Sequence, residues 1–221
     1  MQLFEIQFAW FFKEGIQLDF ENLVSIIRQK TKRQFISPAT YIPLPPMAPP
    51  EIPRAQLQNN DNSSRFTIAL NRADFFVSSI NATLTTSDIE SFYQDLHSFS
   101  EIFLAKIGVI RLGLVGRMCK ISSDPASEIS TSLLKYNSGE LFEVSIKFVE
   151  RHVANKFTYN DSFQFDQGIK IDTQQKILVV TRDINTVPEV PLVGSLEIIT
   201  EFCSVTKERL DIKYINKVMG A

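Results

Sequence analysis

Hydrophobic and polar residues alternate along several segments of the chain, which is the pattern of a strand with one buried face. The first such segment lies at residues 2–10. Two more, at 65–70 and 74–80, are separated by a short turn and predict a β-hairpin. A long strand is expected at 109–121. The second half of the chain adds three predicted strands, at 140–149, 153–160 and 176–184.

In other segments the apolar residues recur with the period of an α-helix. The clearest one opens with Ser87 and Glu90, which have the spacing of a capping box. Asp19 is a suitable N-cap for an earlier helix, and Pro191 is a favoured first residue for the last one. Helices are therefore expected at 19–33, 87–107 and 191–216, with a short one at 127–134.

This order of elements predicts an α+β fold, a mainly antiparallel sheet with helices packed on one face. Residues 1–221 are expected to form a single domain. Residues 3–6 and 141–144 both read Leu-Phe-Glu followed by an aliphatic residue. We therefore consider an internal duplication, with halves 1–121 and 127–221 that share a sheet.

The regular pattern stops in an extended connection at residues 36–64. Residues 43–53 hold six of the ten prolines, a density that excludes a helix or a central strand. In polyproline II geometry this segment spans roughly 34 Å. It would then be a strap across the surface, an arm that reaches a second subunit, or a linker. The residues of this candidate interaction arm are Pro43, Pro46, Pro49, Pro50, Pro53 and Arg54.

Composition changes this picture in few respects. The chain contains 18 Phe, so the core should be filled by aromatic rings. The formal net charge of −2 and the sequence pI near 5.8 make nucleic acid an unlikely partner. Cys119 and Cys203 form no disulfide or metal-binding motif, and no signal peptide or membrane-spanning segment is visible. We therefore expect a soluble cytoplasmic protein with no contact to a membrane.

No motif for catalysis, metal binding or a cofactor stands out. His97 and His152 lie far apart and have no second histidine at helical spacing. Gly113 and Gly116 lie inside a predicted strand, where two glycines indicate a bulge or close packing of a helix on the sheet. We predict no cofactor and no metal, and consider an enzyme less plausible than a binding protein.

Three arginines are the candidate binding residues. Arg111 and Arg117 fall on the same face of the predicted strand at 109–121, and Arg182 lies in a later strand. Buried arginines need anionic partners. The arginines therefore either pair with acidic side chains across the sheet, such as Asp183 or Glu143, or lie on its solvent face, or bind a ligand. The last alternative predicts an anion or ligand site around Arg111, Arg117 and Arg182.

The segments 110–114, Ile-Arg-Leu-Gly-Leu, and 178–184, Leu-Val-Val-Thr-Arg-Asp-Ile, carry a resemblance to known proteins. With the order hairpin, long helix, strand and final helix, the region 60–215 resembles a sporadically distributed family of uncharacterised bacterial proteins. The resemblance implies a fold pattern and no chemistry.

Taken together, the sequence predicts a non-catalytic binding or assembly protein that acts through protein–protein contacts. A homodimer is the expected state, and another protein partner is also considered. The alternative is a small-ligand or anion-binding protein, or an enzyme, with its site near the three arginines.

Overall fold

The structure is a computed structural model, and it describes residues 1–31, 35–79, 83–136 and 141–219. Within these ranges the chain forms one nine-stranded antiparallel sheet, in the order β2-β3-β4-β5-β1-β6-β9-β8-β7. The strands are β1 (Gln2–Phe12), β2 (Thr40–Tyr41), β3 (Ala55–Gln58), β4 (Ser64–Ile68), β5 (Arg72–Ser78), β6 (Val109–Ile121), β7 (Ile146–Val153), β8 (Thr158–Ile169) and β9 (Lys176–Thr186).

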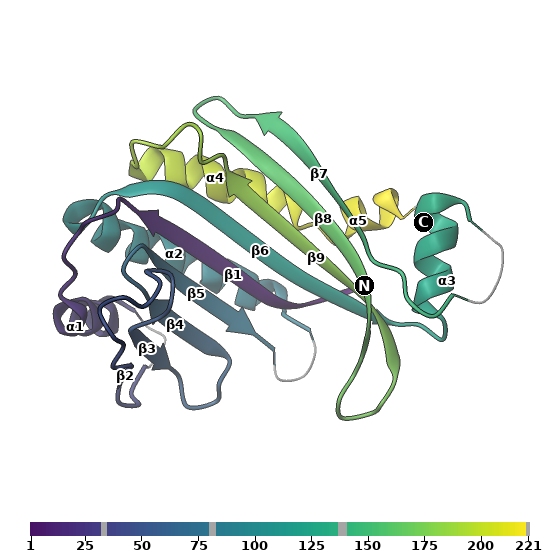
Figure 1. Cartoon of the computed structure of the whole chain (residues 1–221), viewed down its shortest axis with the longest axis horizontal. Coiled ribbons are helices and arrows are strands. Elements are labelled where there is room, and N and C mark those ends of the chain that lie inside the picture. Colours follow the sequence, from purple (N-terminus) through teal and green to yellow (C-terminus); the bar gives the residue numbers. More distant parts are fainter. Residues whose placement is uncertain (32–34, 80–82, 137–140, 220–221) are drawn as a thin grey trace.

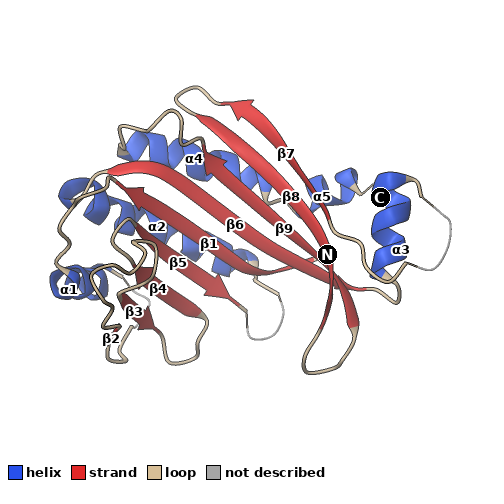
Figure 2. Cartoon of the chain, in the orientation of Figure 1, coloured by secondary structure: helices blue, strands red, loops and turns tan. Residues whose placement is uncertain are grey.

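Four helices cover one face of this sheet, and Figures 1 and 2 show them behind the strands. They are α1 (Phe20–Lys30), α2 (Thr86–Lys106), α4 (Leu196–Arg209) and α5 (Ile212–Val218). The short α3 (Pro125–Ile129) continues into a π-helical turn (Ser130–Leu134) beside one end of the sheet. No helix of the described residues covers the opposite face, which we call the open face. The predicted α+β class, with helices on one face of an antiparallel sheet, is confirmed.

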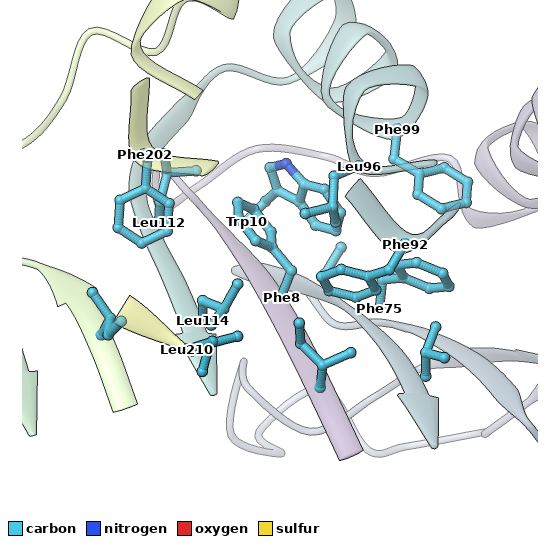
Figure 3. Close-up of a cluster of buried hydrophobic side chains, with 14 of the residues drawn as sticks. Phe8, Trp10, Phe75, Phe92, Leu96, Phe99, Leu112, Leu114, Phe202 and Leu210 are labelled. Atoms are coloured by element: carbon cyan, nitrogen blue, oxygen red, sulfur yellow. The ribbon is translucent and has the colours of Figure 1, made fainter. Parts of the chain in front are cut away.

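The helix-facing side of the sheet is packed with aromatic rings. Phe8 and Trp10 of β1 point towards the helices, and Figure 3 shows them below Leu96 and Phe99 of α2. The indole nitrogen of Trp10 donates to the Ser100 hydroxyl at 2.9 Å, so the buried ring leaves no polar atom unsatisfied. The predicted Phe-rich core therefore lies between the sheet and its helices.

Several element boundaries differ from the sequence prediction. The strands β7 and β8 lie later than the predicted 140–149 and 153–160, the predicted helix at 191–216 is divided into α4 and α5, and the connection at 36–64 contains β2 and β3.

Two helix starts also differ. The capping box of α2 is formed by Thr85 and Asp88, two residues before the predicted Ser87 and Glu90. The last helix begins after Ser195, whose side chain accepts from the Ile198 amide, and not at Pro191. In both helices the start is set by a residue whose hydroxyl accepts a hydrogen bond from a backbone amide of the first turn.

The two halves of the sheet contain their strands in the same order. β1 pairs with the last strand of its half, β5, and β4 and β3 follow outwards. β6 pairs with the last strand of its half, β9, and β8 and β7 follow outwards. A helix, α2 or α4, comes after each set of strands. The halves therefore meet at the β1–β6 pair, and the repeated unit starts again at β6.

This arrangement supplies a topological basis for the duplication, which remains a prediction. It divides the chain between α2 and β6, however, and not after residue 121 as the predicted halves 1–121 and 127–221 do. Residues 3–6 lie in β1, whereas 141–144 precede β7, so the two similar segments are not structurally equivalent. Residues 80 and 81, the end of the predicted strand 74–80 and the residue after it, lie outside the described residues.

The proline-rich segment does not form the predicted 34 Å strap. The Ile42 amide donates to the Arg54 carbonyl at 2.9 Å, so the two ends of the segment lie side by side. Two turns, closed by Ala48 on Pro45 and by Ile52 on Pro49, fold it into a loop between β2 and β3. The Leu70 amide holds this loop by donating to the Pro50 carbonyl. Turn formation at prolines replaces polyproline II here, so a long extended arm is wrong.

The aromatic core predicts a large difference between two Phe→Ala variants. Phe66 is fully buried between Trp10, Phe75, Phe99 and Phe103, so Phe66→Ala should lower the free energy of unfolding by about 3–5 kcal/mol. Phe142 is 84% exposed, and Phe142→Ala serves as the matched control with a change of about 0.5 kcal/mol or less. Urea denaturation followed by circular dichroism measures both. A similar loss in the two variants would contradict the assignment of the core.

Candidate functional site

The structure does not bring the three candidate arginines together. Arg111 and Arg117 lie on the open face, as the alternation along β6 predicted, but six residues of strand separate their backbones by about 20 Å. Arg182 lies on the helix-facing side of β9 and is fully buried. A single site built from all three is therefore excluded by the fold.

Arg182 belongs to a buried structural network. Its Nε and Nη2 atoms donate to the two carboxylate oxygens of Asp161 at 2.9 and 2.6 Å, and its Nη1 donates to the Arg209 carbonyl. The guanidinium carbon lies over the rings of Phe163 and Tyr214, at 4.2 and 4.4 Å from their centroids. Each of the three nitrogens of this cation thus donates to the protein, and because the side chain is fully buried a ligand has no access to it.

Arg117 also has a partner within the protein. Its guanidinium pairs with the Glu5 carboxylate on β1, directly across the strand pair. The predicted partners were acids such as Asp183 or Glu143, and Glu5 takes their place. Because Glu5 and Arg117 lie opposite each other in register, the cross-strand pair satisfies both charges.

The open face contains a cavity of about 380 Å³ at the centre of the sheet. Three strands form it: β1 and β6, whose pairing joins the two halves, and the neighbouring β9, with one residue from β5. Its floor consists of small or apolar residues, and charged or amide side chains surround them. The lining residues are Gln7, Ala9, Phe11, Arg72, Arg111, Gly113, Val115, Asp183 and Asn185.

On one side of the cavity, the charges are matched within the protein. Arg72 donates through Nε to Asp74 at 2.8 Å and makes a second bond to the same carboxylate. Gln7 donates to Asp74 at 2.8 Å as well. This side therefore offers a neutral ion pair and an amide to a ligand.

Arg111 is held in place but keeps donors available. Its Nε donates to the Thr186 carbonyl at 3.1 Å, and its guanidinium lies 4.7 Å from the centroid of the Phe11 ring. Arg72 approaches the same ring at 5.1 Å. No acidic side chain of the described residues forms an ion pair with Arg111. The fixed orientation and the unmatched charge are what an anion-binding group needs.

Asp183 is the unmatched acid of the cavity. The Asn185 amide donates to its carboxylate, but no cation of the described residues forms an ion pair with it. Burial raises the pKa of Asp183, while Asn185 and the more distant charges of Lys147, Arg111 and Arg117 oppose that shift. A carboxylate that stays partly desolvated without a paired cation is a typical feature of functional sites.

The two glycines of β6 serve opposite faces of the sheet. A side chain at Gly113 would meet the Asn185 amide oxygen at 2.5 Å and the Phe11 ring at 3.5 Å, so this glycine keeps the cavity open. A side chain at Gly116 would meet Leu210 at 2.4 Å on the helix side. The predicted close packing of a helix on the sheet is therefore confirmed at Gly116.

Another cavity, of about 420 Å³, lies on the helix side between the start of β1, α2 and the turn from α4 to α5. Its lining is mainly apolar, and burial raises the pKa of Tyr93, whose hydroxyl contacts Thr206 at 3.4 Å. The charged residues that line this cavity, Glu90, Lys207 and Asp211, are exposed. We favour the open-face cavity as the functional site, because Arg111 and Asp183 are partly buried there and neither has an ion-pair partner among the described residues.

Neither the candidate site nor the rest of the described chain brings three metal-binding side chains together. His97 lies 4.0 Å from Glu101 on the surface of α2, and His152 contacts Glu150 and stacks on Tyr159. No described helix is long and apolar enough to span a membrane.

Comparisons of the chain with family models, curated proteins and solved structures found no match. The resemblance based on residues 110–114 and 178–184 thus stays a prediction.

Sequence reasoning identified Arg111 but missed most of the residues around it. Gln7 and Phe11 alternate with the buried Ile6, Phe8 and Trp10, and this alternation indicates that they share one face of β1. Asp183 and Asn185 alternate in the same way on β9. The alternation pattern does not reveal the strand order, in which β1 and β9 lie on the two sides of β6.

The raised pKa of Asp183 predicts an effect of pH on stability. The folded protein holds this proton more tightly than the unfolded chain, so stability rises as pH falls from the raised pKa towards the ordinary value of 3.8. Asp183→Asn removes the titrating carboxyl group and therefore this dependence on pH. At neutral pH the variant should melt at a higher temperature than the wild type, and the difference in melting temperature should disappear in acid. Melting curves between pH 3 and 8 measure it.

The matched control for this experiment is Asp166→Asn, a change on the same face but outside the cavity. It corrects for the loss of one negative charge. An Asp183→Asn variant that melts below this control at neutral pH would show that the carboxylate is satisfied in the fold, contrary to the prediction.

Proposed function

We propose that this protein is a non-catalytic binding protein that holds a small polar ligand in the cavity on the open face of its sheet. The observation that carries the proposal is the presence of Arg111 and Asp183 in one cavity without an ion-pair partner for either. Charged groups at this degree of burial lose hydration, and the cost is recovered when a ligand supplies the missing partner. The volume of about 380 Å³ is that of a small-molecule site.

The surrounding structure supports binding more directly than chemistry. The floor of the cavity lies on β1 and β6, the two central strands, so its geometry is fixed by pairing on both sides. Rigid elements position binding groups well. The cavity contains no histidine, cysteine, serine or lysine, so it lacks a nucleophile paired with a general base. Cys119 and Cys203 are both free thiols, which supports the expected cytoplasmic location.

The proposal predicts a ligand-dependent rise in melting temperature that depends on the cavity. In a thermal-shift panel of small anions, cations and zwitterions, a ligand at about 100 times its Kd should raise the melting temperature by about 5–10 °C. Gly113→Val fills the cavity by displacing the Asn185 side chain, and Arg111→Gln removes a binding group. Both variants should lose the shift.

Arg117→Gln is the control, because Arg117 lies on the same strand and face but is paired with Glu5 outside the cavity. It should keep the full response. Shifts that persist in both Gly113→Val and Arg111→Gln would place the binding elsewhere and contradict the proposal.

A second candidate function, self-association through a sheet edge, is supported by the exposure of β7. This eight-residue strand ends the sheet, and Val149 and Val153 are 54% and 82% exposed. The opposite edge, β2, has only two residues. A long free edge can pair with a strand of another chain, while Glu150 and Arg151 restrict pairing to a complementary partner.

Self-association of this kind predicts a homodimer that β7 holds together. Light scattering at micromolar concentration should give twice the chain mass of 25.2 kDa, and Val149→Lys with Val153→Lys should reduce it to a single chain. Lysine at the exposed positions Ile169 and Ile171, in and after β8, provides the control. A single-chain mass for the wild type would rule out this candidate.

A further inference from the structure

Four charged side chains lie at or next to the open-face cavity. Arg72 is neutralised by Asp74, which also accepts from Gln7. Arg111 contributes one unmatched positive charge from β6, and Asp183 contributes one unmatched negative charge from β9. The cavity is therefore neutral as a whole but carries two separated charges of opposite sign.

These two charges form no ion pair with each other. Arg111 lies four residues from Val115, the β6 partner of Asp183, so the two backbones are about 14 Å apart along the strands. The Arg111 side chain is tied back by the Thr186 carbonyl and the Phe11 ring, and Asn185 occupies the position between the two charges on β9. The fold thus holds the guanidinium and the carboxylate apart across the cavity.

A ligand with a single charge would satisfy one of these groups and bury the other without a partner. A purely anionic ligand would pair with Arg111 and place further negative charge near Asp183, and a purely cationic ligand would do the reverse. Only a ligand with both charges, separated by several ångströms, completes both contacts at once.

We propose that the open-face cavity binds a small zwitterion, whose carboxylate is held by Arg111 and whose ammonium group is held by Asp183, with the aliphatic part over Gly113 and Val115. The inference rests on the proposed function and names its ligand class. The pair of amides, Gln7 and Asn185, supplies hydrogen bonds to the middle of such a ligand.

The test uses matched ligands and the whole chain of 221 residues. Isotope-labelled protein is titrated with ω-amino acids from glycine to 6-aminohexanoate, and with the alkanoate and the alkylamine of equal length. Chemical shifts of the amides of β1, β6 and β9 report binding. One ω-amino acid should bind about tenfold or more tightly than its matched alkanoate and alkylamine, since a hydrogen bond to a charged group contributes that much. The length of the ω-amino acid that binds most tightly measures the distance between the two charged groups of the site.

Two variants assign the ends of the ligand. In Asp183→Asn the ω-amino acid should bind no better than the alkanoate, and in Arg111→Gln no better than the alkylamine. Arg117→Gln should change neither. The amide spectrum of each variant confirms that it is folded, and Arg111→Met, which keeps the aliphatic stem but not the charge, replaces Arg111→Gln if that variant unfolds.

The outcomes separate the two proposals. Equal binding of alkanoate and ω-amino acid to the wild type, with loss of both in Arg111→Gln, would overturn the zwitterion inference and leave the proposed ligand-binding function standing. Shifts that are absent for every ligand, or that are unchanged in both Arg111→Gln and Asp183→Asn, would overturn the inference and the proposed site together.

Discussion

The antiparallel pair of β1 and β6 is the interaction on which the rest of the structure depends. Each strand leads one half of the sheet and is paired on both sides, so a shift of one residue in their pairing would invert the faces of one half relative to the other. The register fixes Phe8 opposite Leu114 towards the helices and Gln7 opposite Val115 towards the open face. The packed core and the polar cavity are two consequences of this one register.

The alternation of side chains between the two faces of the sheet also decides the environment of each charged residue. Arg182 and Asp183 are neighbours in β9, yet one enters the helix side and the other the open face. On the helix side, a bidentate carboxylate and two aromatic rings enclose the guanidinium, and a buried charge without such partners would be strongly destabilising. On the open face, the neighbouring carboxylate has only an amide. The fold therefore satisfies one buried charge completely and leaves the next one available.

Much of the architecture could be predicted from periodicity, because alternation and helical repeats are local properties of the sequence. β6 was predicted with its observed bounds, and α2 was predicted to within one residue at each end. The site could be predicted only in part. Arg111 stands out as a charge in a strand, but its separation from Arg182 depends on the strand order, and that order arises from contacts between residues distant in the chain. Even the proline-rich loop required a long-range contact, the bond from Leu70 to Pro50.

The composition of the open face argues that its charges are not explained by stability. A sheet face in contact with water needs only polar side chains, and cross-strand pairs such as Glu5 with Arg117 provide them at no cost in unmatched charge. At the cavity the chain departs from this pattern twice. Gly113 places a glycine in the middle of a central strand, where a glycine weakens the sheet. Asp183 is partly desolvated and has no paired cation among the described residues. Both departures lower stability, and both act on the same space. Two independent costs thus converge on one cavity, which is the space that the proposed ligand would occupy.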